Sequence, residues 1–132
     1  MERKGGGPMC YTLREEIQEK LKNKNYHCEK ELTLSIISGK WKLVILWHLG
    51  VEGSHRFSDL QRLFENISHK TLSKQLKELI EDGLISRKVY PESPPRVEYS
   101  MTKLGYTILP IVKMMYEWGK NRISQLRQEG LL

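Results

Sequence analysis

The stretch Ser68–Gly83, with the sequence SHKTLSKQLKELIEDG, decides how the rest of the chain is interpreted. Ser68 is a favoured N-cap residue, because its hydroxyl can accept a hydrogen bond from an unpaired amide of the first helical turn. Gly83 suits the position just after a helix, where the backbone turns left-handed. Between them the apolar residues are spaced by four, three and one: Leu72, Leu76, Leu79 and Ile80. This spacing puts them on one face and predicts an amphipathic helix.

The polar face of this helix carries residues suited to binding DNA. Hydroxyl, imidazole and ammonium groups gather in its first half, whereas Glu78, Glu81 and Asp82 occupy the last turns. A helix with donors and positive charge at its N-terminal end fits the major groove and the neighbouring phosphates. The alternative is an ordinary solvated surface helix. The candidate contact residues are Ser68, His69, Lys70, Thr71, Ser73, Lys74 and Lys77.

The segments on either side favour the DNA-binding interpretation. Upstream, residues 57–64 form a short amphipathic pattern and residues 65–67 a tight link, so that 57–82 reads as a helix-turn-helix. Downstream, residues 84–90 and 96–101 are strand-like, and the proline-rich segment 91–95 joins them. We expect 84–101 to be a wing that contacts the DNA backbone, although an ordinary solvated hairpin is the alternative. The candidate wing contacts are Arg87, Lys88 and Arg96.

The N-terminal third supplies the expected core and one interface helix. Residues 1–9, with three consecutive glycines, predict a flexible tail, and the remaining 10–132 a single domain. Thr12 to Glu15 fits a capping box that begins a first helix with one narrow apolar stripe: Leu13, Ile17 and Leu21. A second helix is expected over 29–37. A third over 40–49 is apolar on most sides and should be the most buried element.

The C-terminal segment 103–129, capped by Thr102, predicts a long helix with more apolar surface than a small winged domain can cover. Exposed apolar surface of that size marks a protein interface. We expect a twofold dimer, whose recognition helices would face two half-sites of a pseudo-palindromic operator. Trp41, Trp47 and Trp118 could line a ligand pocket at that interface, but core positions are favoured. The candidate interface residues are Leu13, Ile17, Leu21, Ile108, Ile111, Met115 and Trp118.

Composition limits the class of protein. The 132 residues carry a net charge of +6, which favours a polyanionic partner such as double-stranded DNA. Neither a membrane span nor a signal peptide is recognisable, so we expect a cytoplasmic protein with reduced cysteines and no membrane partner. A metal site of Cys10, His27 and Cys28 lacks any typical ligand spacing. No catalytic motif is recognisable, and we therefore expect no enzyme activity, no metal and no cofactor.

Several stretches resemble the HxlR family of bacterial winged helix-turn-helix transcription regulators. They include ISGKWKL at 37–43, ISHKTLSKQLKEL at 67–79 and YPESPPRVEYSMT at 90–102, and the resemblance covers about 27–120. It implies a homodimer built by the N- and C-terminal helices, with the recognition helix and wing on DNA. It also implies a sensing role for Cys28. The chain departs from the family at Glu29, where proline is usual, and at Ser38, where glycine is frequent.

The residues around Cys28 leave its role open. A helix start favours a thiolate and Lys30 adds to this effect, whereas Glu29 and Glu31 oppose it. An oxidant or electrophile sensor needs an accessible thiolate, and the alternative is a half-buried cysteine acting as a small hydrophobe. Cys10 beside the flexible tail is expected to be inert, although it could form a disulfide with Cys28.

The sequence therefore predicts a mostly α fold with a small β-hairpin wing, in a homodimeric, sequence-specific DNA-binding transcription regulator. Cys28 is its candidate switch for oxidation or electrophile modification. Two alternatives stay open. One is a small-molecule-gated repressor with inert cysteines, and the other is a winged-helix protein-interaction module without DNA binding.

Overall fold

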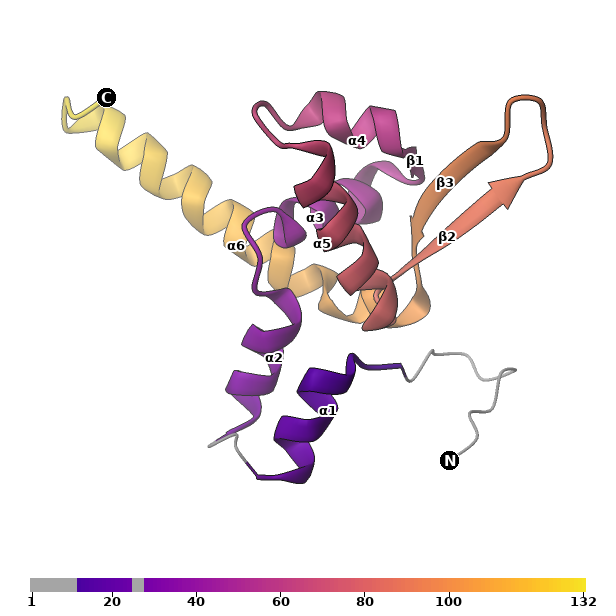
Figure 1. Cartoon of the computed structure of the whole chain (residues 1–132). Coiled ribbons are helices and arrows are strands. Elements are labelled where there is room, and N and C mark those ends of the chain that lie inside the picture. The colour runs from indigo at the N-terminus through magenta and orange to yellow at the C-terminus, as the bar shows by residue number, and fades with distance from the viewer. Residues whose placement is uncertain (1–11, 25–27) are drawn as a thin grey trace.

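The computed structural model describes residues 12–24 and 28–132, so the predictions for the tail 1–9, Cys10 and His27 lie outside the described residues. The described elements, in chain order, are α1 (Glu15–Lys22), α2 (Glu29–Ile37), α3 (Lys42–Glu52), β1 (His55–Arg56), α4 (Phe57–Leu63), α5 (His69–Glu81), β2 (Ile85–Tyr90), β3 (Arg96–Met101) and α6 (Lys103–Gln128) (Figure 1). The strands form one antiparallel sheet in the order β1-β3-β2. This is the mostly α fold with a β-hairpin wing that the sequence predicts.

The core lies where α3, α4, α5, the sheet and the first half of α6 meet. The apolar face of α5 is buried there through Leu72, Leu76 and Leu79. Packing apolar residues spaced by four and three onto the core leaves the opposite, polar face of α5 in solvent. Helix α3 is the centre of this core, as expected, with three apolar side chains fully buried: Ile45, Leu46 and Leu49.

Some boundaries differ from the sequence predictions. The capping box predicted at Thr12 is wrong, because the N-cap of α1 is Arg14. Helix α3 begins two residues later than predicted and extends to Glu52. Strand β1 was not predicted at all; its two residues pair with β3, His55 opposite Tyr99 and Arg56 opposite Glu98.

Helices α1 and α2 lie side by side at one end of the molecule, below α5 and α6 in the view of Figure 1. Ile17 of α1 is buried, yet it does not belong to the main core cluster, to which α2 contributes Ile37 at its last turn. The N-terminal pair therefore has little share in the apolar core.

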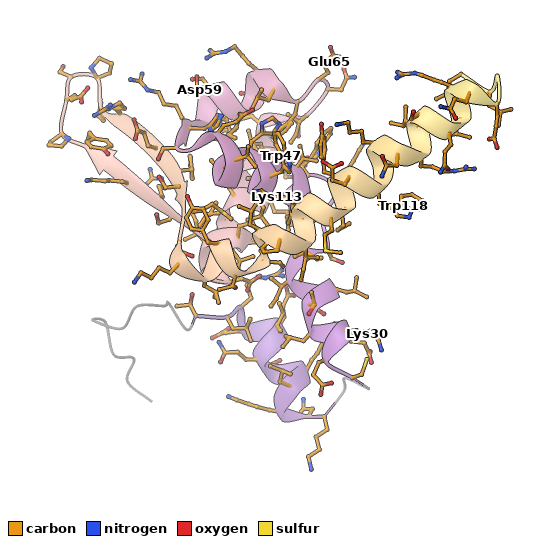
Figure 2. The ribbon with its side chains drawn as sticks, turned by 180° about the vertical axis from the view of Figure 1, so that it is seen from behind. Lys30, Trp47, Asp59, Glu65, Lys113 and Trp118 are labelled. Atoms are coloured by element: carbon orange, nitrogen blue, oxygen red, sulfur yellow. The ribbon has the colours of Figure 1, made fainter. Side chains whose placement is uncertain are left out.

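The two halves of α6 have different surroundings. The first half packs on the core through Leu109 and Val112. The second half projects from the body and ends near the C-terminus (Figures 1 and 2). The core position favoured for Trp118 is wrong for this chain, because its side chain is 71% exposed.

No single helix in the described part of the chain is long and apolar enough to cross a membrane. Helices α2 and α3 meet the length and composition criteria only as a pair bent by 80°.

One close backbone contact fixes the start of α6. The side chain of its N-cap Thr102 accepts a hydrogen bond from the Gly105 amide at 3.0 Å and donates to the Gly83 carbonyl at 2.6 Å. A Cβ atom at Gly105 would lie only 2.1 Å from the Leu84 carbonyl oxygen. Only glycine fits there without displacing the backbone.

Two glycine-to-alanine substitutions on α6 should therefore have opposite effects. Gly105→Ala should lower the free energy of unfolding by about 2–3 kcal/mol, because backbone must move to admit the methyl group. Gly119→Ala, where the added Cβ meets nothing within 4 Å, should raise the free energy by about 0.5–1 kcal/mol through helix propensity. Urea denaturation followed by circular dichroism at one protein concentration measures both. Equal effects of the two substitutions would contradict this account.

Candidate nucleic-acid interface

Both ends of α5 are capped as the sequence predicts. Ser68 is the N-cap, and its Oγ accepts a hydrogen bond from the Thr71 amide at 3.0 Å. Gly83 follows the C-cap Asp82 with a φ of 78°, a left-handed conformation that favours glycine. The same Ser68 hydroxyl donates to Thr71 Oγ1 at 2.9 Å. The Ser68 hydroxyl is therefore already hydrogen-bonded within the cap, and the main role of Ser68 is to begin α5.

The other predicted recognition residues gather on the outer face of α5. His69, Lys70, Lys74 and Lys77 are exposed, and Thr71 and Ser73 are partly exposed. The His69 ring lies against Phe57 of α4, with 4.5 Å between ring centroids, and its Nδ1 lies 3.4 Å from Ser73 Oγ. The contact with α4 holds His69 at the N-terminal end of α5, beside the turn between the two helices.

The strand register separates the three predicted wing residues. Side chains alternate between the faces of a strand, so Arg87 and Lys88 point to opposite faces of the hairpin. Arg87 lines a groove of about 560 Å³ between the wing and α5, together with Phe57, His69, Ser73, Leu76, Lys77, Ile80, Glu81, Val97 and Tyr99. Arg87 therefore faces the same groove as the exposed side of α5.

Lys88 and Arg96 surround Tyr90 on the other face of the hairpin. The Lys88 ammonium lies 4.8 Å and the Arg96 guanidinium 3.9 Å from the centre of the Tyr90 ring. Arg96 also forms ion pairs with Glu92 and Glu98, each at 3.1 Å. These two carboxylates offset its charge, so the structure does not support Arg96 as a free cation for DNA.

Charged side chains anchor the inner side of α5. Glu78 pairs with the buried Lys42 of α3 at 2.7 Å, and Asp82 pairs with Arg14 at 2.9 Å. Burial disfavours ionisation of Glu78, but the hydrogen bond from Lys42 and the nearby positive charges outweigh burial and hold its pKa below the ordinary value. Gln75 adds a neutral anchor, since its Oε1 accepts from the Trp41 amide at 2.9 Å.

Cys28 is the N-cap residue of α2 and is partly exposed. Its backbone amide donates to the Glu31 carboxylate at 3.2 Å, which closes the first turn of the helix. A thiol at a helix start fits the position expected of a reactive cysteine. Among residues 12–24 and 28–132, no group of three or more histidine, cysteine or acidic side chains is arranged to hold a metal ion.

The predicted interface residues divide into three groups by exposure. Ile17 is buried within its own chain and Ile108 packs on the core, so neither is available to a partner in this arrangement. Leu13 is partly exposed. Four are exposed, by between 42% and 71%: Leu21, Ile111, Met115 and Trp118.

The tryptophans do not converge on one pocket. Trp41 stacks on Phe64 at 5.3 Å, whereas Trp47 contacts Tyr116 of α6 at 5.3 Å. Trp47 of α3 lies against α6, whereas Trp118 lies further along α6 and projects away from the body (Figure 2). An apolar groove of about 440 Å³ runs beside Trp47, lined by Leu43, Val44, Trp47, His48, Val112, Met115 and Tyr116. It adjoins the exposed apolar side of α6.

A helix-turn-helix followed by an antiparallel hairpin defines the winged helix-turn-helix class. The sequence profile of the HxlR-like helix-turn-helix family matches residues 36–127. The putative regulatory protein MalR of Fusobacterium mortiferum is 54% identical over 99 residues, which cover 75% of this chain and 92% of MalR. The chain belongs to the HxlR family. It is thus a transcriptional regulator of the helix-turn-helix type and not an enzyme.

Solved structures agree with this assignment. The redox regulator HypR in its reduced form matches with a TM-score of 0.71 and 40% identity, over 76% of this chain and 99% of HypR. Its oxidized form matches with a TM-score of 0.69 and 44% identity, over 71% and 96%. These matches confirm the predicted family and fold class.

Proposed function

We propose that this protein is a homodimeric, cytoplasmic transcription regulator that binds double-stranded operator DNA through α5 and the wing. The observation that carries the proposal is the division of α5 into two sides. Two of its acidic residues, Glu78 and the C-cap Asp82, are paired inward, and a third, Glu81, is exposed in the last turn. The lysines of its first half are also exposed, at the opposite end of the helix. An exposed, positively charged N-terminal half of a helix suits the major groove and its phosphates.

The groove between α5 and the wing supports the same proposal. Arg87 and Lys77 both line it, from the hairpin and from the helix. We assign the wing contact to Arg87 in the first place, because Lys88 and Arg96 lie on the opposite face around Tyr90.

A lysine substitution on α5 tests DNA binding. Lys74→Ala should weaken binding to the DNA upstream of the protein's own gene several-fold, and it should reduce the slope of log K against log[salt] by about 0.9 if one phosphate contact is lost. Lys113→Ala removes the same charge from α6 (Figure 2) and should change neither quantity. Fluorescence anisotropy at several salt concentrations, with a scrambled duplex for comparison, measures both. Equal affinities of Lys74→Ala and Lys113→Ala would contradict the assignment of α5.

The dimer proposal rests on the apolar surface of α6. Ile111, Met114, Met115, Trp118 and Ile123 are all exposed in the single chain, next to the groove beside Trp47. Such a large contiguous apolar surface is unusual on a monomer and is best covered by a second copy. A twofold dimer would also place two copies of α5 against two half-sites.

Placing a charge on this surface should dissociate the dimer. Trp118→Glu should shift the sedimentation coefficient from that of a dimer to that of a monomer, because a carboxylate would be buried without a partner. Val51→Glu introduces the same charge at an exposed apolar residue of α3 and should leave the dimer intact. A monomeric wild-type protein, or a dimeric Trp118→Glu protein, would refute the interface.

We further propose that oxidation at Cys28 switches DNA binding. Support comes from the position of Cys28 at the start of α2 and from the similarity to a redox regulator. In the expected first step a hydroperoxide oxidises the thiolate to a sulfenic acid and is itself reduced to an alcohol or water.

Mild peroxide treatment tests the switch. The DNA affinity of the wild type should change on oxidation and recover with a thiol reductant, and Cys28→Ser should bind equally before and after treatment. Cys10→Ser is the matched control and should respond like the wild type. A change of DNA affinity on oxidation of the Cys28→Ser protein would contradict the proposed switch. An unchanged DNA affinity of the oxidised wild type would favour a small ligand as the signal.

A further inference from the structure

Arg14 connects the N-terminal segment to the recognition helix through polar contacts. Its Nε lies 2.9 Å from one oxygen of Asp82, and its backbone amide donates to the other at 3.0 Å. Its Nη1 lies 3.4 Å from Glu78, one turn earlier on α5. A single residue thus holds the C-terminal half of α5 at two acidic side chains.

The same guanidinium also contacts α2. Its Nη2 donates to the Ser35 carbonyl at 2.8 Å, in the last turns of that helix. The side chain of Arg14 is only 11% exposed and that of Asp82 is fully buried. Because a planar guanidinium presents its donors in a fixed fork, α2 and α5 are held in one relative orientation.

The surrounding apolar packing is incomplete. An open groove of about 360 Å³ lies where the N-terminal segment, α2 and α6 meet, lined by Thr12, Leu13, Leu32, Thr33, Ile36, Asp82, Leu84, Leu104, Thr107 and Ile108. Across this groove the three elements share no close apolar packing, so polar contacts contribute more to their relative placement. A movement of α1 and α2 relative to α5 would therefore break Arg14 from Asp82 or pull on α5.

We propose that Arg14 is a positioning residue for DNA binding: it fixes α5 to the pair α1–α2, so that the placement of this pair sets the orientation of the recognition helix. The inference rests on the proposed DNA-binding function of α5. It extends that function, because Cys28 lies at the start of α2 and a change there would reach α5 through Arg14.

Hydrogen–deuterium exchange of the full chain, without DNA, tests the coupling, and anisotropy with the upstream DNA tests its effect. Arg14→Gln alone leaves the buried Asp82 carboxylate without its partner and can unfold the protein. The double variant R14Q/D82N avoids a lone buried charge and keeps an acceptor for the residue 14 amide. It should increase exchange of the α5 amides at least tenfold, leave those of α3 unchanged, and lose at least tenfold in specific affinity.

Glu16→Gln is the matched control. It removes an ion pair of Arg14, at 3.1 Å, that does not involve α5, and it should match the wild type in both measurements. Unchanged exchange of α5 in R14Q/D82N, or an equal loss in Glu16→Gln, would overturn the proposal. If the wild type lacks specific DNA binding, the proposed function fails, and the exchange rates alone decide whether Arg14 positions α5.

Discussion

The structure depends on four charged side chains that meet between the N-terminal segment, α3 and α5. Lys42 and Asp82 are fully buried, and each has a partner of opposite charge, Glu78 and Arg14 respectively. Removing one member of a buried ion pair typically costs about 3–5 kcal/mol, because the remaining charge is left without water or a counter-ion. The leucines of α5 make it lie on the core, and the charges determine how it lies there.

This arrangement also explains how one short helix carries acidic and basic groups without conflict. The carboxylates of Glu78 and Asp82 are neutralised from the protein side, by Lys42 and Arg14. The exposed charges of α5 are then the lysines of its first half and Glu81 in its last turn. The distribution of exposed charge along α5 thus depends on tertiary contacts as well as on the sequence of the helix.

The sequence predicted those features that depend only on residues close together in the chain, such as the helix caps. The caps Ser68 and Thr102 were predictable because a cap acts within three residues of the helix start. The pair Arg14–Asp82 was not, because 68 positions separate its members and no periodicity relates them. Strand β1 was missed because two residues give no alternation to recognise. The neutralisation of Arg96 was missed although Glu92 and Glu98 lie within four residues of it, because a list of basic residues does not show which side chains form ion pairs.

The stack around Tyr90 has an entropic consequence. Lysine and arginine side chains each lose up to about 2 kcal/mol of rotamer freedom when they become fixed. Lys88 and Arg96 are already held against the Tyr90 ring, so part of this loss is incurred during folding. This face of the hairpin is therefore already ordered before a ligand binds. On that face the hairpin would add mainly a steric boundary to recognition, whereas the charged wing contact proposed above comes from Arg87 on the opposite face.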